Sequence, residues 1–365
     1  MTRIKDIIHS LEEWAPVALA ESYDNAGLLV GDQNREITGV LISLDCTERV
    51  VQEAIAKDCN MVISHHPLLF KGLKKLTGSN YVERTVELAI KNDIALYAIH
   101  TNLDNVNTGV NKRICDKIGL KNTRILAPKS GRLQKLEFFV PENDAEKVRG
   151  AIFKAGAGKI GNYEDCSFNS NGVGTFTPTE NANPTIGQSG KPQKEDEVRV
   201  EVLIPDYLSR AILMAMKKAH PYEEVAYFLH KLENVHQNIG SGMIGTLPEA
   251  MDARAFLKNL KEKMGLQVIK CTSIVSKKVE TIAVCGGSGS FLLNDAKRQA
   301  ADVFITSDFK YHEFFEAENT LIIADIGHYE SERFTIELIA EKLSENFRTF
   351  ATHLTEVNTN PILYI

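Results

Sequence analysis

The chain has few cysteines, and their spacing suits neither a metal ribbon nor a disulfide framework. Six cysteines are scattered through 365 residues, and no two of them form a CxxC pair. Zinc ribbons and disulfide-stapled secreted domains both depend on closely spaced cysteines. We therefore expect reduced thiols that mostly pack in the interior. The six are Cys46, Cys59, Cys115, Cys166, Cys271 and Cys285.

Long hydrophobic runs and an excess of positive charge are also missing. No segment approaches the roughly 18 uninterrupted apolar residues that a membrane span needs. Residues 1–14 contain charged side chains where a signal peptide would be apolar. The formal net charge is -6, whereas broad nucleic-acid binding depends on clustered Lys and Arg. The sequence thus predicts a cytoplasmic protein without a membrane span and argues against broad, non-specific binding of nucleic acid, while a local basic patch stays compatible with it.

Both outer thirds of the chain alternate apolar, strand-like runs with stretches of helical period. This alternation is typical of βα units on a mainly parallel sheet, where strands are buried on both faces. The expected strands are 40–44, 61–64, 94–99, 281–285, 303–306 and 320–326, and the final helix runs from about 329 to 347.

The middle of the chain differs and carries a weak internal repeat. The segments LEFFVP (136–141) and VEVLIP (200–205) each look like a strand that ends at proline and precedes a helix. Strand-like segments near 166–176 and 224–230 complete the order β-α-β-β-α-β. This order is the ferredoxin-like arrangement.

Length and loop composition suggest how these parts are divided. A chain of 365 residues exceeds the size at which one core usually keeps growing. Stretches rich in Gly and Pro near 127–131 and 238–242 mark the borders of the middle part. We predict an α/β protein whose outer metal-binding domain, residues 1–127 and 238–365, is interrupted by an inserted ferredoxin-like α+β domain, residues 128–237.

Polar side chains of the kinds that bind metal ions come immediately after several of the predicted strands. In open α/β sheets, ligands bind at the carboxyl ends of the strands. These distant segments should therefore converge at one edge. The residues that follow strands are His65, His66, His100, Asp104 and His328, together with Asp45 and Asp308.

The spacing of four of these ligand candidates favours two ions over one. His328 and Glu332 are four residues apart at the start of a helix, so both can reach the same ion. The side chains of His65 and His66 diverge in an extended segment, so one ion rarely binds both. A carboxylate such as Glu332 can bridge two neighbouring ions. Histidine with carboxylate suits Zn, with Fe or Mn as alternatives, better than Ca or Mg.

Other polar residues are candidates for orienting the ligands or moving protons. A metal-bound histidine usually donates its second N–H to such a partner. Polar residues at strand ends also serve as ordinary caps, which is the competing interpretation. The candidates are His100, His312, Asp45 and Asp308, together with Asn25 in the DNAGL turn.

Two further motifs allow ligand binding without requiring it. CGGSGS (285–290) lies between a strand and a helical stretch, where amides of Gly286, Gly287 and Ser288 could bind an anion of the substrate. The motif is neither a complete P-loop nor GxGxxG, and a tight turn explains it equally well. HPYEE (220–224) could line a pocket in the middle part, although a helix stop with a polar surface also accounts for it.

Four motifs occur in order along the outer parts: SYDNAGLLVGD (22–32), ISHHPLLFKG (63–72), HTNLD (100–104) and DIGHYESE (325–332). Together they resemble the Nif-three-like family, whose members are often labelled GTP cyclohydrolase 1 type 2 homologues. The resemblance covers roughly residues 1–127 and 238–365. The middle part is similar to the inserted module of longer members, which itself resembles PII and CutA-type proteins.

The resemblance implies both a metal site and an assembly. Family members hold two divalent ions per subunit and form hexameric rings that enclose a cavity, so a homohexamer built as a dimer of trimers is expected. The implied ligands are His65, His66, Asp104, His328 and Glu332, and none of them is substituted here.

Two functions are compatible with these residues. The first is a metal-dependent hydrolase, for which the family label implies GTP as the substrate, although another nucleotide or a phosphoester suits the residues as well. The second is a non-enzymatic metal-binding or metal-delivering assembly, in which the inserted module senses a small molecule or contacts a partner. The sequence leaves both open.

Overall fold

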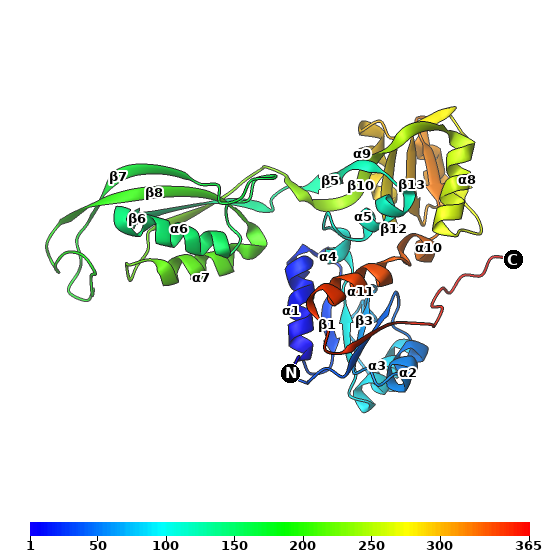
Figure 1. Ribbon diagram of the computed structural model, residues 1–365, viewed down its shortest axis with the longest axis horizontal. Coiled ribbons are helices and arrows are strands. Elements are labelled where there is room, and N and C mark those ends of the chain that lie inside the picture. The colour runs from blue at the N-terminus through cyan, green and yellow to red at the C-terminus, as the bar shows by residue number, and fades with distance from the viewer. The chain divides into compact units, whose positions relative to one another are not determined.

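The computed structural model describes residues 1–365, which divide into two compact units. The first unit comprises Met1–Pro128 and Asn238–Ile365, and the second comprises Lys129–Gln237 (Figure 1). All six cysteines are free thiols, and Cys46, Cys59, Cys115 and Cys285 are buried. None of the helices has the length and hydrophobicity needed to cross a membrane.

The first unit contains a five-stranded sheet. In spatial order its strands are β1 (Gly27–Val30), β4 (Ala95–Ala98), β3 (Met61–Ser64), β2 (Gly39–Ser43) and β15 (Ala351–Leu354). All neighbours are parallel except β1 and β4. The helices of this half are α1 (Ile4–Trp14), α2 (Glu48–Ala56), α3 (Tyr81–Lys91) and α11 (Thr335–Asn346), with a 3-10 turn η1 (Val17–Leu19).

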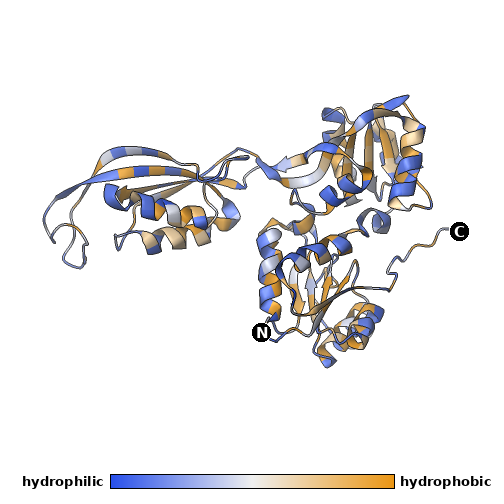
Figure 2. Cartoon of the chain, viewed as in Figure 1, coloured by the Kyte–Doolittle hydropathy of each residue, from blue (hydrophilic) through white to orange (hydrophobic).

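Helices α2 and α3 pack against this sheet through Val50, Val86 and Ala89, while α11 contacts both β2 and α1. Every residue of β2, β3 and β4 is buried as a result. Burial of both faces explains why these strands are continuous apolar runs without alternation. The same strands appear as hydrophobic segments in Figure 2.

A second, six-stranded sheet lies in the same unit. Its order is β11 (Lys270–Cys271), β14 (Ile322–Asp325), β13 (Val303–Ser307), β12 (Lys278–Ser288), β10 (His236–Asp252) and β5 (Lys121–Lys129). Strands β12, β13 and β14 are parallel. The helices nearby are α5 (Val110–Ile118), α8 (Ala253–Met264), α9 (Leu293–Arg298) and α10 (His328–Glu332), with the 3-10 segments η4 (Ser290–Leu292) and η5 (Tyr311–Ala317).

The two sheets differ from the sequence-based expectation in two respects. The predicted strands are all present, but they are divided between two sheets within one unit. The second sheet is mixed, because β10 and β11 pair antiparallel with the parallel strands β12 and β14. The predicted final helix is two helices, because a turn at Arg333 and Phe334 separates α10 from α11. Both His328 and Glu332 lie on the short helix α10, before the break.

The second unit has the element order β-α-β-β-α-β. Its elements are β6 (Leu133–Pro141), α6 (Ala145–Lys154), β7 (Phe168–Phe176), β8 (Gln193–Pro205), α7 (Ser209–Ala219) and β9 (Tyr227–Lys231). The antiparallel sheet has the order β7-β8-β6-β9. Strands β6 and β8 both end at proline and continue through one 3-10 turn, η2 (Glu142–Asp144) or η3 (Asp206–Leu208), into a helix. The core includes Phe138, Val148, Val200 and Ile212.

Candidate metal centre

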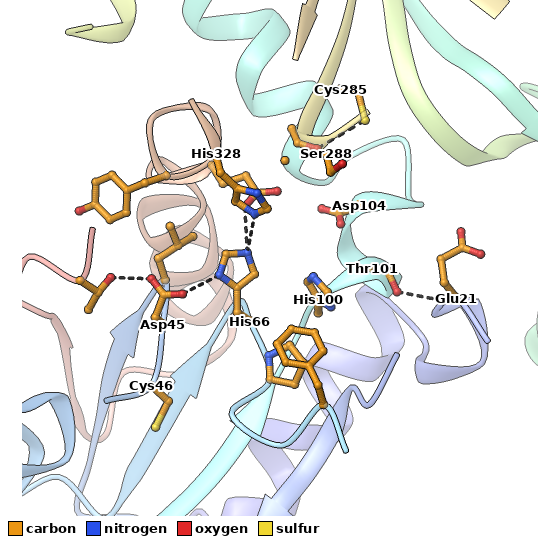
Figure 3. A pocket seen from close by; sticks show the side chains of 18 of the residues that line it. Glu21, Asp45, Cys46, His66, His100, Thr101, Asp104, Cys285, Ser288 and His328 are labelled. Atoms are coloured by element: carbon orange, nitrogen blue, oxygen red, sulfur yellow. Dashed lines mark hydrogen bonds and ion pairs between the residues drawn. The ribbon is translucent and has the colours of Figure 1, made fainter. Parts of the chain in front are cut away.

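The carboxyl ends of strands from both sheets of the first unit line one cavity of about 610 Å³. Strand β3 is followed directly by His65 and His66. Strand β4 leads into the short helix α4 (Thr101–Asp104), whose last residue lines the cavity. Strand β14 of the other sheet leads into α10, which carries His328 and Glu332. Figure 3 shows His328 facing His66 across the cavity.

One group of ligand side chains, which we call the inner position, consists of His65, Asp104 and Glu332. The His65 Nε2 atom lies 3.6 Å from Asp104 Oδ1 and 3.8 Å from Glu332 Oε1. Both His65 Nε2 and Asp104 Oδ1 are buried without any hydrogen-bond partner. A buried polar atom left unpaired costs about 1–3 kcal/mol. A cation bound between these atoms would satisfy both of them.

The tautomer of His65 is set by the backbone. Its Nδ1 lies 2.8 Å from the carbonyl oxygen of Ile99, and a carbonyl oxygen can only accept a hydrogen bond. Nδ1 therefore carries the proton, and the lone pair of Nε2 points into the inner position. Because His65 is 0% exposed, this orientation is held by surrounding protein on every side.

The second group, which we call the outer position, consists of His66, His328 and Glu332. Glu332 Oε2 lies 3.0 Å from His66 Nε2 and 3.2 Å from His328 Nε2, and the two nitrogens are 3.3 Å apart. Asp45 Oδ1 lies 2.8 Å from His66 Nδ1, and Asp308 Oδ2 lies 2.6 Å from His328 Nδ1. The structure therefore places both aspartates as supports for histidines, the arrangement that is usual around bound metal.

In the metal-free protein, the Glu332 carboxylate and the imidazoles of His66 and His328 stabilise one another's charged forms. Burial would raise the pKa of Glu332, but hydrogen bonds from His328 and His66, together with the nearby ring of His65, hold it well below its ordinary value. Burial would lower the pKa of His66, but Asp45 and Glu332 raise it to about 10. The pKa of His328 is raised to about 9 against the effect of burial, by Glu332 and Asp308. Protons thus occupy the place that a cation would take.

The inner position concentrates negative charge. Burial, followed by the charge of Glu332, raises the pKa of Asp104. Burial also raises the pKa of Cys285, with Asp104 and Glu332 adding to the effect, so this nearby thiol stays neutral. Two carboxylates that share a buried site cannot both ionise comfortably unless a positive charge lies between them. The donor set therefore suits a divalent cation.

His100 lies beside the ligands, with its ring centroid 5.3 Å from those of both His65 and His66. Its Nδ1 is 2.8 Å from Asp24 Oδ1, and Asp24 also accepts hydrogen bonds from the backbone N–H and the hydroxyl of Thr101. These hydrogen bonds lower the pKa of Asp24 to about 2, although burial opposes them. The Asp24 carboxylate therefore stays charged and fixes the ring of His100.

Asp24 was missed by the sequence analysis, which selected its neighbour Asn25. The Asn25 side chain instead donates to the carbonyl of Leu69 at 2.5 Å and so anchors the loop after β3. The DNAGL turn does lie beside the histidines, but the residue that reaches them depends on which way each side chain points. A carboxylate next to a predicted histidine cluster would have been the better choice, because imidazole N–H groups prefer charged acceptors.

The glycines of the CGGSGS segment make room for Glu332. The Gly286 N–H donates to Asn111 Oδ1 and the Gly287 N–H donates to Ser331 Oγ, each at 2.9 Å. Gly287 has a φ of +64°, and a side chain there would collide with the Glu332 carboxylate. Neither amide can bind an anion without losing its present partner. The predicted anion site therefore depends on Ser288, which lines the cavity.

The structure does not bring His312 to the cavity. It lies in η5, exposed, with its ring against those of Tyr311 and Phe315. The sequence pattern could not separate it from the ligands because it also follows a strand, β13. The wall that sequence analysis missed is the segment after β15, from which Thr359 and Asn360 line the cavity.

Comparisons with known proteins cover the whole chain. The family profile described as Duf34/NIF3 (NGG1p interacting factor 3) matches residues 2–361. Proteins named GTP cyclohydrolase 1 type 2 homolog from Bacillus subtilis and Halalkalibacterium halodurans are each 37% identical, covering 99% and 98% of this chain and 98% of each relative. A Bacillus cereus protein related to NIF3 has a similar crystal structure, with 38% identity, a TM-score of 0.87 and coverage of 100% of this chain and 99% of that one.

Proposed function

This chain belongs to the Duf34/NIF3 family, and from that membership and the geometry of its cavity we propose that it is a metal-dependent hydrolase. We propose that two divalent ions bind to His65, His66, Asp104, His328 and Glu332. The observation that carries the proposal is the pair of buried, unpartnered atoms, His65 Nε2 and Asp104 Oδ1. Buried polar atoms are nearly always hydrogen-bonded, so an unpaired donor set facing one point suits a ligand.

Two ions suit the site better than one because Glu332 divides its oxygens between the two positions. Oε1 faces His65, and Oε2 faces His66 and His328. A carboxylate arranged in this way can bridge two ions. The mixture of imidazole and carboxylate groups favours zinc, with iron or manganese as alternatives.

The ions would supply an acidified water and stabilise the negative charge that develops during hydrolysis. The residues of the chain hold and move protons around that chemistry. We propose that His100, fixed by Asp24, exchanges a proton with the substrate or water, since its ring lies beside two of the ligands. A general acid or base must lie within reach of the reacting group, which His100 does from the wall of the cavity.

An anionic substrate such as a nucleotide or a phosphoester suits the rim of the cavity. The loop after β3 places Phe70 on the cavity wall and continues with the exposed Lys71, Lys74 and Lys75. No acidic side chain pairs with these lysines, although the chain as a whole has a net charge of -6. The relatives' name, GTP cyclohydrolase 1 type 2 homolog, makes GTP the first nucleotide to try.

The protein purified without chelators should contain about two ions per chain and hydrolyse at least one nucleotide or phosphoester. Elemental analysis measures the ions, and a panel that includes GTP, with release of formate or phosphate as the readout, measures turnover. The His65→Ala variant should lose the inner ion. His312→Ala is the matched control and should keep both ions, because His312 lies outside the cavity.

Absence of turnover with every substrate, combined with fast exchange of both ions, would favour a metal carrier over a hydrolase. A cavity of about 740 Å³ in the second unit supports this second candidate, in which that unit senses a small molecule. The cavity is lined by Tyr222 and Glu223 from the HPYEE segment and by Phe176 and Arg199. We propose that the second unit is a ferredoxin-like module of the PII and CutA type, inserted at residues 128–237.

We also propose that the chain forms a homohexamer, a dimer of trimers whose metal centres face an internal space. The metal cavity opens at strand ends, and a closed assembly would shield it from bulk water. Exposed Phe291, Tyr311 and Phe315 on the first unit are suited to burial in such contacts. Light scattering should give about six times the 40.6 kDa of one chain. A monomer at micromolar concentration would contradict the proposal.

A further inference from the structure

The segment after β15, the last part of the first unit, is held in place by hydrogen bonds to carboxylates. Strand β15 runs parallel to β2, so the chain leaves β15 at the edge where Asp45 follows β2. Residues 355–362 then pass along the wall of the metal cavity, which they line from Thr359 to Ile362. Three of its side chains contact acidic residues: Thr355 donates to Glu53, Thr359 to Asp45, and Asn360 to Glu330.

One of these contacts continues into the outer metal position. The Thr359 hydroxyl donates to Asp45 Oδ2 at 2.7 Å, and the other oxygen, Oδ1, lies 2.8 Å from His66 Nδ1. The His66 Nε2 atom faces Glu332 Oε2 at 3.0 Å. Since Asp45 accepts the Nδ1 proton, the lone pair of His66 Nε2 is the one directed at an ion. Thr359 thus holds the carboxylate that sets the tautomer and orientation of His66.

The inner position has no equivalent support. His65 is oriented by the main-chain carbonyl of Ile99 and is completely buried. Asp45 is different, because its side chain is 34% exposed and must be held against exchange with water. A partly exposed carboxylate that loses one of two fixed hydrogen bonds gains rotational freedom, and the imidazole bound to it loses a fixed orientation.

We propose that Thr359 is a positioning residue for the outer metal position: through Asp45 it sets the affinity of the ion bound by His66 and leaves the inner ion unchanged. The inference rests on the pair of ions in the proposed function. Partners that orient a metal-bound histidine typically contribute 10–100-fold to affinity. Thr359 is one hydrogen bond further from the ion than Asp45, so its loss should weaken the affinity for the outer ion about tenfold.

The test is a titration of the metal-free full-length protein with Co²⁺, followed by visible absorption and by the number of bound ions. Thr359→Val should weaken one of the two ions about tenfold, and Thr359→Ser should restore it. The matched control is Thr355→Val, which removes the same kind of hydroxyl from the same segment but from Glu53, a residue that contacts no ligand. The absorption band that weakens should be the one missing from His328→Ala, which lacks only an outer ligand.

The outcomes separate the inference from the proposed function. If Thr359→Val binds both ions as Thr355→Val does, or weakens both ions equally, the positioning role is wrong and the hydrolase proposal is unaffected. If Thr359→Val selectively loses affinity for one ion while the wild-type protein shows no turnover on any substrate, the positioning role holds and the hydrolase proposal fails. Equal thermal stability of metal-free Thr359→Val and Thr355→Val would show that the loss of metal affinity does not come from a loss of folding.

Discussion

Replacing Glu332 with glutamine should leave both metal positions nearly empty. Glu332 is the single residue that faces His65, His66 and His328 together, and its side chain is only 3% exposed. Loss of a group that merely supports a ligand already weakens metal binding about 10–100-fold. Loss of a charged ligand shared by two ions should therefore exceed about 100-fold at both positions. Glutamine keeps the volume of the side chain, so the fold should survive.

Elemental analysis after dialysis against buffer with a trace of Zn²⁺ measures this loss. Glu337→Gln is the matched control, since Glu337 lies on the next helix and pairs with Lys117 instead of a ligand. The control should keep two ions per chain. Retention of one tightly bound ion in Glu332→Gln would mean that the carboxylate belongs to one position only, and that the bridging role is wrong.

Metal binding should weaken steeply as the pH falls. In the protein alone, the pKa of His66 is raised to about 10 and that of His328 to about 9, in both cases by carboxylates that outweigh burial. An ion must displace these protons, because only neutral imidazole binds metal. Below about pH 9, each proton released costs about tenfold in affinity per pH unit. We expect at least one proton to be released at the outer position.

Calorimetry in buffers of different ionisation enthalpy counts the released protons directly. His328→Ala is the control and should release fewer protons at the outer position. An affinity that is the same at pH 6 and pH 8 would contradict the prediction and show that both imidazoles are already neutral in the folded protein.

The stability of the metal-free protein should follow the opposite trend with pH. A raised imidazole pKa means that folding takes up protons, so protonated His66 stabilises the fold. This contribution is complete below the ordinary imidazole pKa of about 6.5 and disappears as the pH rises through about 10. The same carboxylates that hold these protons are the ones that would bind the ions.

Most secondary structure of the outer parts could be predicted because its signals are local. Strand β3 begins and ends at the residues that its apolar run predicted, 61–64. Strands β1, β5, β10, β11 and β15 escaped prediction, and β15 is short and only partly buried. A strand of this kind owes its structure to pairing with β2, which lies about 300 residues earlier in the chain, so nothing in its own sequence marks it.

The sequence by itself showed that histidines and carboxylates follow predicted strands, and this picked out His65, His66, Asp104, His328 and Glu332 as candidate metal ligands before any fold was known. A βα repeat places such residues at one edge of its sheet whatever the rest of the chain does. Only the tertiary structure decided that the carboxyl edges of two separate sheets line one cavity, that Asp24 reaches His100 while Asn25 does not, and that Thr359 touches Asp45. These contacts join residues tens to hundreds of positions apart, and their geometry follows from how sheets, helices and the last segment pack. No local periodicity encodes that packing, because it is the sum of many weak contacts across the whole unit.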